Sequence, residues 1–276
     1  MSLTSTERQA EMLKLEGNTA FNRQRFQAAI DMYTEAITLC PYVPEYYTNR
    51  ALCFRKRNVW KRVEEDCTRA IELDHKSVKA HYMLGLALLE REEYTGGIQK
   101  LEKALDFGRV GDPEGYMVEE IWQRLAKAKY TQWEEESNKR VWRLQELKKT
   151  CEKALKQHHF LEASQTGSIS EEAADAHAER MKQLDQVFEI AAESDTPTEV
   201  PDYLCCKITL DIFRDPVISP SGVTYERAMI VDHLYKVGKF DPFTREPLEL
   251  DQLVPNLAIK EALQAFLNEH GWAYRT

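Results

Sequence analysis

Residues 17–39 read GNTAFNRQRFQAAIDMYTEAITL, and the same pattern returns 34 positions later at 51–73 and again at 85–107. A small residue, an aromatic residue, an alanine and two apolar residues keep this register in all three copies. These columns are Gly17, Ala51 and Gly85; Phe26, Trp60 and Tyr94; Ala36, Ala70 and Ala104; Ile37, Ile71 and Leu105; and Leu39, Leu73 and Phe107. The period predicts stacked pairs of antiparallel helices, with the aromatic at the turn inside each pair.

The repeat resembles the tetratricopeptide repeat, and we expect three copies within residues 6–109, at about 10–43, 44–77 and 78–109. One helix pair is too small to bury its own apolar face, so neighbouring pairs share a core and form a concave groove. The small and aromatic columns are expected in that core. Ligand binding would therefore come from polar residues that face the groove.

Four polar residues occupy corresponding faces of the three repeats, namely Lys14, Asn18, Asn49 and Lys79. They match the carboxylate clamp of chaperone-binding tetratricopeptide domains. That resemblance implies a ligand with a free C-terminal carboxylate and a nearby aspartate, because lysines and amides donate hydrogen bonds to carboxylate oxygens. Such clamps often carry a basic residue four positions after the third-repeat lysine. Here this position is Met83, so we expect Met83 and Tyr82 to contact apolar ligand residues.

The charge is uneven, because residues 1–110 carry 17 basic and 16 acidic residues while the whole chain has a net charge of −9. An acidic chain without a basic patch argues against nucleic-acid binding. Six scattered cysteines without a Cys-x-x-Cys pair predict reduced thiols, with neither a disulfide framework nor a metal site. We expect no cofactor.

The longest apolar stretch, Tyr82–Leu89, has only eight residues, so we expect no membrane span. The N-terminus lacks the basic segment and apolar core of a secretory signal. We expect a cytoplasmic protein that could also enter the nucleus.

Residues 112–195 predict a helical hairpin. Apolar residues keep steps of three and four on both arms, with a polar break at 164–170 and a loop before it at 108–115. The stripes are Val141, Leu144, Leu147, Cys151 and Leu155 on the first arm, and Ala174, His177, Met181, Leu184, Phe188 and Ala191 on the second. We expect this coiled-coil-like element to form a homodimer with its copy in a second chain. The alternative is a rigid spacer that docks on the repeats.

Residues 196–202 form a linker with two prolines, and residues 203–276 resemble the U-box, the zinc-free relative of RING ubiquitin-ligase domains. The resemblance rests on motifs in chain order: Asp215-Pro216-Val217, Gly222, Thr224-Tyr225-Glu226-Arg227, Ile230, His233-Leu234, Asp241-Pro242, Thr244, Pro247-Leu248 and Leu253-Val254-Pro255-Asn256. A RING domain needs eight zinc ligands, and this stretch holds two cysteines and two histidines. Hydrogen bonds and ion pairs would replace the metal, with Thr224, Tyr225, Glu226, Arg227 and Asn256 as structural candidates.

The resemblance implies a surface for a ubiquitin-conjugating enzyme (E2) on two loops. Its residues would be Ile208 and Leu210 in the first loop and Pro242, Phe243 and Arg245 in the second, with Arg245 contacting both E2 and ubiquitin. Core packing of Ile208 and Leu210 is the alternative, because Lys207–Leu210 alternates in hydropathy. The ligase would position the E2-ubiquitin thioester and supply no catalytic nucleophile. Cys205 or Cys206 as a nucleophile is the other alternative.

The chain is therefore expected to be mainly α, with a three-repeat solenoid, a central antiparallel hairpin and a small C-terminal α+β U-box. This order resembles the CHIP family of co-chaperone E3 ubiquitin ligases. The resemblance implies binding of the acidic C-terminal tails of heat shock protein 70 and 90 chaperones and ubiquitination of misfolded clients, with E2 and ubiquitin as further partners. A non-catalytic chaperone adaptor and a pure co-chaperone are the alternatives.

Overall fold

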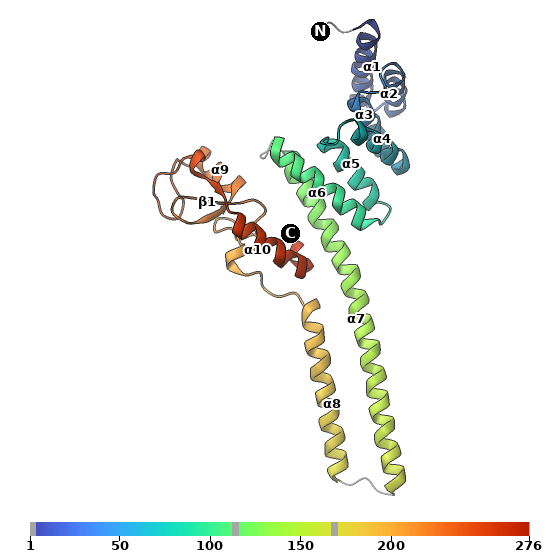
Figure 1. The fold of residues 1–276 in the computed structure, drawn as a ribbon, viewed down its shortest axis with the longest axis vertical. Coiled ribbons are helices and arrows are strands. Elements are labelled where there is room, and N and C mark those ends of the chain that lie inside the picture. The colour runs from blue at the N-terminus through green and yellow to red at the C-terminus, as the bar shows by residue number, and fades with distance from the viewer. Residues whose placement is uncertain (1–3, 112–115, 167–170, 276) are drawn as a thin grey trace. The chain divides into compact units, whose positions relative to one another are not determined.

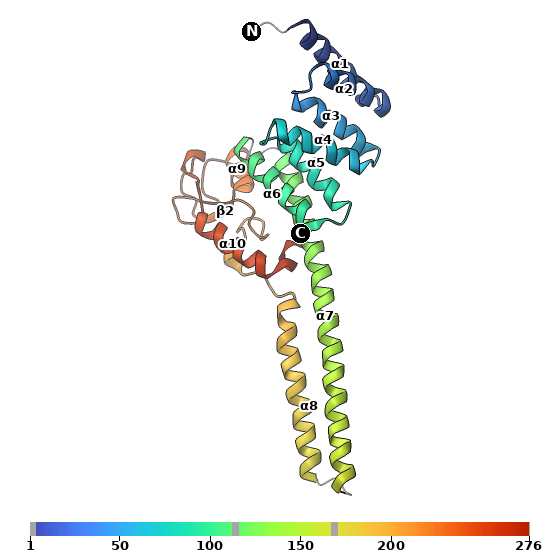
Figure 2. The same ribbon diagram turned by 45° about the vertical axis from the view of Figure 1, so that its right-hand side comes forward.

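The computed structural model describes residues 4–111, 116–166 and 171–275 (Figures 1 and 2). The fold is mainly α, with helical repeats, a long hairpin and a small sheet near the C-terminus, as the sequence predicts. The chain divides into two compact units, Met1–Lys129 and Tyr130–Arg275. Among the described residues, none of the helices combines the length and apolar character needed to cross a membrane.

Three antiparallel helix pairs build the first unit. The pairs are α1 (Ser5–Asn22) with α2 (Phe26–Leu39), α3 (Pro44–Lys56) with α4 (Trp60–Leu73), and α5 (Val78–Leu89) with α6 (Tyr94–Gly111). The aromatic column starts the second helix of every pair. Thr4 caps α1 through a capping box with Glu7, which satisfies two backbone amides at the helix start.

The turn inside each pair repeats at the level of the backbone. Gln24, Asn58 and Glu92 lie 34 positions apart and adopt φ of 60°, 57° and 62°. The following amide in each copy donates to the carbonyl five residues earlier, from Arg25 to Ala20 and at the two equivalent positions, at 2.9–3.0 Å. This is the bonding of a Schellman motif, which ends a helix with one left-handed residue.

The small-residue column marks close helix approach. A Cβ built on Gly17 would lie 2.6 Å from Tyr33 Cε1, and one built on Gly85 would lie 2.8 Å from Leu101 Cγ. The alanine column at Ala36, Ala70 and Ala104 is fully buried. Both columns belong to the core.

The prediction of a loop at 108–115 is wrong for residues 108–111, because α6 continues to Gly111. Residues 112–115 lie outside the described part. A Cβ on Gly108 would lie 3.2 Å from Val118 Cγ2 on α7 (Tyr116–Thr166). The glycine therefore permits close approach of α7 and does not break the helix.

The second unit begins with the remainder of α7, which runs antiparallel to α8 (Glu171–Ala192) (Figures 1 and 2). The rings of His159 and His177 stack between the arms with centroids 4.4 Å apart, and Lys148 pairs with Asp185 at 2.7 Å. The stripes only partly face each other. Leu147, Ala174 and Ala191 are exposed, and α7 extends to Thr166 beyond the start of the predicted break. Residues 167–170 lie outside the described part.

A small three-stranded antiparallel sheet organises the C-terminal part of this unit. The strands β1 (Pro216–Ile218), β2 (Thr224–Glu226) and β3 (Val254–Pro255) lie in the order β2-β1-β3. Helices α9 (Arg227–Lys236) and α10 (Leu257–Glu269) follow β2 and β3. One core cluster joins the sheet to α9 and comprises Val217, Tyr225, Ile230, Val231, Leu234, Leu248 and Leu253.

Candidate functional site

The third-repeat lysine of the predicted clamp meets the second-repeat asparagine. Lys79 Nζ on α5 donates to Asn49 Oδ1 on α3 at 2.8 Å. Burial lowers the pKa of Lys79, although the nearby Glu45 carboxylate acts in the opposite direction. Because the Asn49 oxygen accepts from Lys79, its amide nitrogen is the group turned toward other partners.

The two first-repeat members of the clamp lie one turn apart on α1. Tyr33 donates its hydroxyl to Asn18 Oδ1 at 2.7 Å, which orients this amide in the same manner as Asn49. Lys14 Nζ lies 2.5 Å from Glu11 Oε1 and 3.4 Å from Glu45 Oε2. The negative charge of Glu45 favours the protonated form of Lys14 and also that of Lys79. One carboxylate therefore influences both lysines of the clamp.

The structure does not bring Tyr82 and Met83 to the surface in the way the sequence predicts. Met83 is 1% exposed and Tyr82 is 4% exposed. The Tyr82 hydroxyl donates to Glu120 Oε1 on α7 at 2.6 Å, and the Arg55 guanidinium lies 6.0 Å from the centre of its ring. In this conformation both side chains are core residues, because α5 is apolar on nearly every face.

The residues of the predicted E2 surface are largely exposed to solvent. Leu210 is 78% exposed, Phe243 67% and Ile208 42%, while Arg245 is also exposed and Pro242 is half-buried. The core alternative for Ile208 and Leu210 is therefore wrong. The Lys207 ammonium lies 5.3 Å from the centre of the Phe243 ring, which brings the first loop against the second.

The two loops share one backbone frame, which the sequence does not reveal. In loop 206–211 the amide of residue 206 donates to the carbonyl of 211, and the amide of 210 donates to the carbonyl of 206, both at 2.8 Å. Loop 241–246 repeats this pattern at 2.8 and 2.9 Å. The fifth residue of each loop is left-handed, with φ of 64° at Leu210 and 66° at Arg245. Single β-bridges, Cys205 to Ile212 and Phe240 to Pro247, flank the loops.

A buried carboxylate holds the second loop. Asp241 is 2% exposed and accepts five hydrogen bonds. The donors are Tyr225 OH at 2.6 Å, the amides of Phe243 and Thr244 at 2.9 and 3.0 Å, and the hydroxyls of Ser221 and Ser219 at 2.8 and 3.0 Å. Burial alone would raise the pKa of Asp241, but these bonds hold it well below its usual range. One charged acceptor thus performs the cross-linking that a metal ion performs in a RING domain.

The five predicted structural residues take part in related contacts. Glu226 accepts from the amides of Arg214 and Asp215 at 2.7 and 3.1 Å, and Arg227 pairs with Asp215 at 2.7 Å. Burial raises the pKa of Glu226 despite these donors.

Asn256, the last of the five structural candidates, makes three hydrogen bonds around the sheet. Its amide nitrogen donates to Thr224 Oγ1 at 2.9 Å, its amide oxygen caps α10 at Ile259, and its backbone nitrogen bonds to Pro216 at 2.9 Å. Asn256 thereby ties β3 to both other strands.

The thiols fit poorly with nucleophilic catalysis. Cys206 is buried and its sulfur accepts from the Glu226 amide at 3.3 Å. Burial, together with Asp202 and Asp211, raises the pKa of the Cys205 thiol and disfavours the reactive thiolate. Within the described ranges, no cluster of three or more His, Cys, Asp or Glu residues could hold a metal ion.

Comparison with known proteins finds a family match in the C-terminal part of the chain and a relative of nearly the whole chain. The U-box domain family matches residues 200–272. An Arabidopsis thaliana protein named E3 ubiquitin-protein ligase CHIP is 63% identical over 266 residues, which cover 96% of each chain. The chain belongs to the CHIP family. The resemblance of its parts to this family is thereby confirmed.

Two solved tetratricopeptide domains resemble the repeats. The TPR2B domain of yeast Sti1, solved as a complex with an Hsp70 peptide, is 30% identical; the match covers 44% of this chain and 96% of that one, with a TM-score of 0.42. The second TPR domain of human RPAP3, solved with the HSP70 peptide SGPTIEEVD, is 27% identical; the match covers 45% and 98%, with a TM-score of 0.40.

Proposed function

We propose that this CHIP-family protein uses Lys14, Asn18, Asn49 and Lys79 to bind the acidic C-terminal tail of heat shock protein 70 and 90 chaperones, and uses its U-box to ubiquitinate the chaperone-bound client. The protein is a U-box E3 ubiquitin ligase, and its co-chaperone role follows from joining these two activities in one chain. Its ligase partners are an E2 and ubiquitin.

The observation that carries the ligase activity is the exposed apolar surface on two loops of one shape. Ile208, Leu210 and Phe243 form this surface. The buried Asp241 carboxylate holds the second loop in shape by accepting hydrogen bonds from it. Such a patch suits docking of E2, because apolar anchors on a rigid frame lose little conformational freedom on binding.

Catalysis in this proposal is a matter of geometry. The thioester lies on E2, and the ligase favours the arrangement in which a substrate lysine attacks it. Arg245 stands exposed at the rim of the second loop, with its guanidinium 5.2 Å from the centre of the Phe240 ring. It can donate several hydrogen bonds to E2 and ubiquitin together.

The clamp is supported by the orientation of its amides. The amide oxygens of Asn18 and Asn49 each accept from a protein donor, Tyr33 and Lys79 respectively, which leaves the amide nitrogens as the groups that can donate to a ligand. Two lysines and two amide donors complement the terminal carboxylate and the aspartate side chain of a tail ending in Glu-Glu-Val-Asp.

Reconstituted ubiquitination tests both activities. Lys79→Ala should reduce modification of the chaperone and its client but preserve self-ubiquitination, because it removes a clamp donor and leaves the U-box unchanged; Lys76→Ala, at an exposed lysine nearby, is the matched control. Pro242→Ala should stop all transfer and leave tail binding unchanged, with Pro220→Ala in the exposed β1–β2 turn as its control. Chaperone modification by Lys79→Ala at the wild-type rate would refute the clamp. A wild-type protein that binds tails without transferring ubiquitin would be a non-catalytic adaptor.

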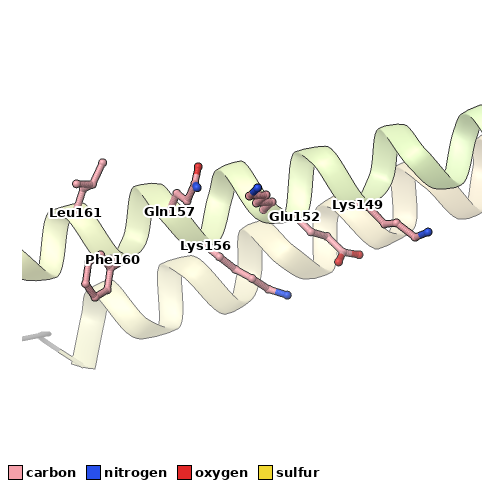
Figure 3. Close-up of a pocket in the computed structure, with 7 residues that line it drawn as sticks. Lys149, Glu152, Lys156, Gln157, Phe160 and Leu161 are labelled. Atoms are coloured by element: carbon pink, nitrogen blue, oxygen red, sulfur yellow. The ribbon is translucent and has the colours of Figure 1, made fainter.

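We also propose a homodimer formed by the hairpin. Large apolar side chains remain exposed on both arms, including Phe160 at 70% on α7 and Ile190 at 66% on α8. A pocket on α7 is lined by residues of this helix alone, and Figure 3 draws these seven side chains and labels six of them. A second copy of the hairpin could cover these surfaces. Sedimentation of the full chain should give twice 32.1 kDa, and Phe160→Asp should lower this mass toward one chain.

A cytoplasmic location, with access to the nucleus, completes the proposal. It is supported by six cysteines that are all free thiols. Imaging of a fluorescent fusion at its natural expression level tests it.

A further inference from the structure

A carboxylate of the protein itself lies in the candidate clamp. Glu45 is in the first turn of α3, and its side chain is 55% exposed. Its Oε2 atom lies 3.4 Å from Lys14 Nζ, close enough for an ion pair. Lys14 also pairs with Glu11 on its own helix. The ammonium group that would receive a ligand carboxylate is therefore already engaged.

The influence of Glu45 extends beyond Lys14. Its charge favours the protonated form of Lys79, and it raises the pKa of Tyr33, to which burial contributes more. Tyr33 is the residue that orients Asn18. The charge of Glu45 thus influences both lysines of the clamp and also Tyr33, which holds the Asn18 amide in place.

We propose that Glu45 is a resident competitor in the clamp, whose carboxylate holds Lys14 in the free protein and is displaced when an acidic tail binds. This inference rests on the proposed clamp. In this proposal the four clamp residues bind the tail, and Glu45 determines how tightly the tail is bound.

Two physical effects reduce affinity in the same direction. The tail carboxylate competes with Glu45 for the Lys14 ammonium, and the displaced Glu45 carboxylate then repels the acidic tail. Removing both effects should strengthen binding by about two- to fivefold, the range expected for one exposed ion pair. Removal should also steepen the salt dependence, because added salt no longer weakens a competing internal pair.

A purely structural role predicts a different outcome. An acidic residue in the first helical turn stabilises α3 through the helix dipole. Glu45→Gln would then lower the melting temperature without strengthening binding. Glu45→Asp separates the two roles, because it keeps the charge at the helix start and shortens the reach toward Lys14.

The test uses the full chain and a fluorescent SGPTIEEVD peptide, with affinity measured by polarisation at several salt concentrations. Glu45→Gln should bind about two- to fivefold more tightly than wild type, and Glu45→Asp should lie between them. Glu72→Gln is the charge-matched control, because Glu72 pairs with Arg69 on α4. Its affinity should equal that of wild type.

The clamp is checked in parallel with Lys79→Ala and with the C-terminally amidated peptide. If the wild type binds, Lys79→Ala loses binding and Glu45→Gln is no tighter than wild type, the competitor role is refuted and the clamp stands. If Lys79→Ala binds as tightly as wild type, or the wild type does not bind at all, the clamp is refuted and this inference with it.

Discussion

Asp241→Asn is expected to lower the free energy of unfolding of the U-box by about 3 kcal/mol and to impair ubiquitin transfer. The substitution preserves the size of the side chain but removes its charge. It therefore tests whether this acceptor holds the second loop in place of a metal ion.

The magnitude follows from the five donors around the carboxylate. A hydrogen bond to a charged group contributes about 1 kcal/mol more than one between neutral groups. The three bonds to Oδ1, from Tyr225 and the amides of Phe243 and Thr244, would remain but weaken by that amount each. At Oδ2 the new amide nitrogen would face the hydroxyls of Ser219 and Ser221, which would have to rotate and accept.

Urea unfolding of the full chain, followed by fluorescence, measures the stability change, and reconstituted transfer with E2 measures activity. Glu246→Gln is the matched control, because Glu246 is exposed in the same loop. It should unfold like wild type. Asp241→Asn that unfolds within about 0.5 kcal/mol of wild type and transfers ubiquitin normally would refute the role assigned to this carboxylate.

Three further predictions concern packing, binding and pH. Gly85→Ala should destabilise the repeats by about 1–3 kcal/mol because its Cβ would lie 2.8 Å from Leu101 Cγ, whereas Gly96→Ala, with a nearest contact of 3.4 Å, should not; thermal melting compares them. Leu210→Ala should abolish E2 binding in calorimetry with little change in melting temperature, and a large loss of stability would contradict its exposed placement. The stability contributed by Asp241 is present above the carboxyl's ordinary pKa of about 4 and is lost as pH falls toward its depressed folded value. Urea midpoints measured from pH 7 to 3 should fall less steeply at acid pH for Asp241→Asn than for wild type.

Much of the fold was predictable because it depends on local spacing. The small-residue and alanine columns of the 34-residue repeat predicted positions that the structure buries, and the U-box motifs predicted the small domain. The left-handed residues of the repeat turns were not predictable, because Gln24 and Glu92 lack the conformational freedom of glycine and are selected by the bonds of the completed helices.

The sequence predicted some residues of the candidate sites and missed others, because several of them depend on contacts between distant parts of the chain. Asp241 could be recognised only as part of a U-box motif, since its donors come from residues 219 to 244 and meet only in the folded domain. Met83 kept the position of a clamp residue in the sequence, but the packing of an apolar α5 buried it. Glu45 gave no signal by itself, because its importance depends on its distance from Lys14 on another helix.

The common frame of loops 206–211 and 241–246 separates the shape of the ligase surface from its chemistry. Backbone bonds and inward groups define each loop, while the exposed side chains of Ile208 and Phe243 carry no part of that closure. Substitutions at these two positions can therefore change the choice of E2 while the domain keeps its fold. The U-box offers an interchangeable recognition surface for engineering ligases that work with a selected conjugating enzyme.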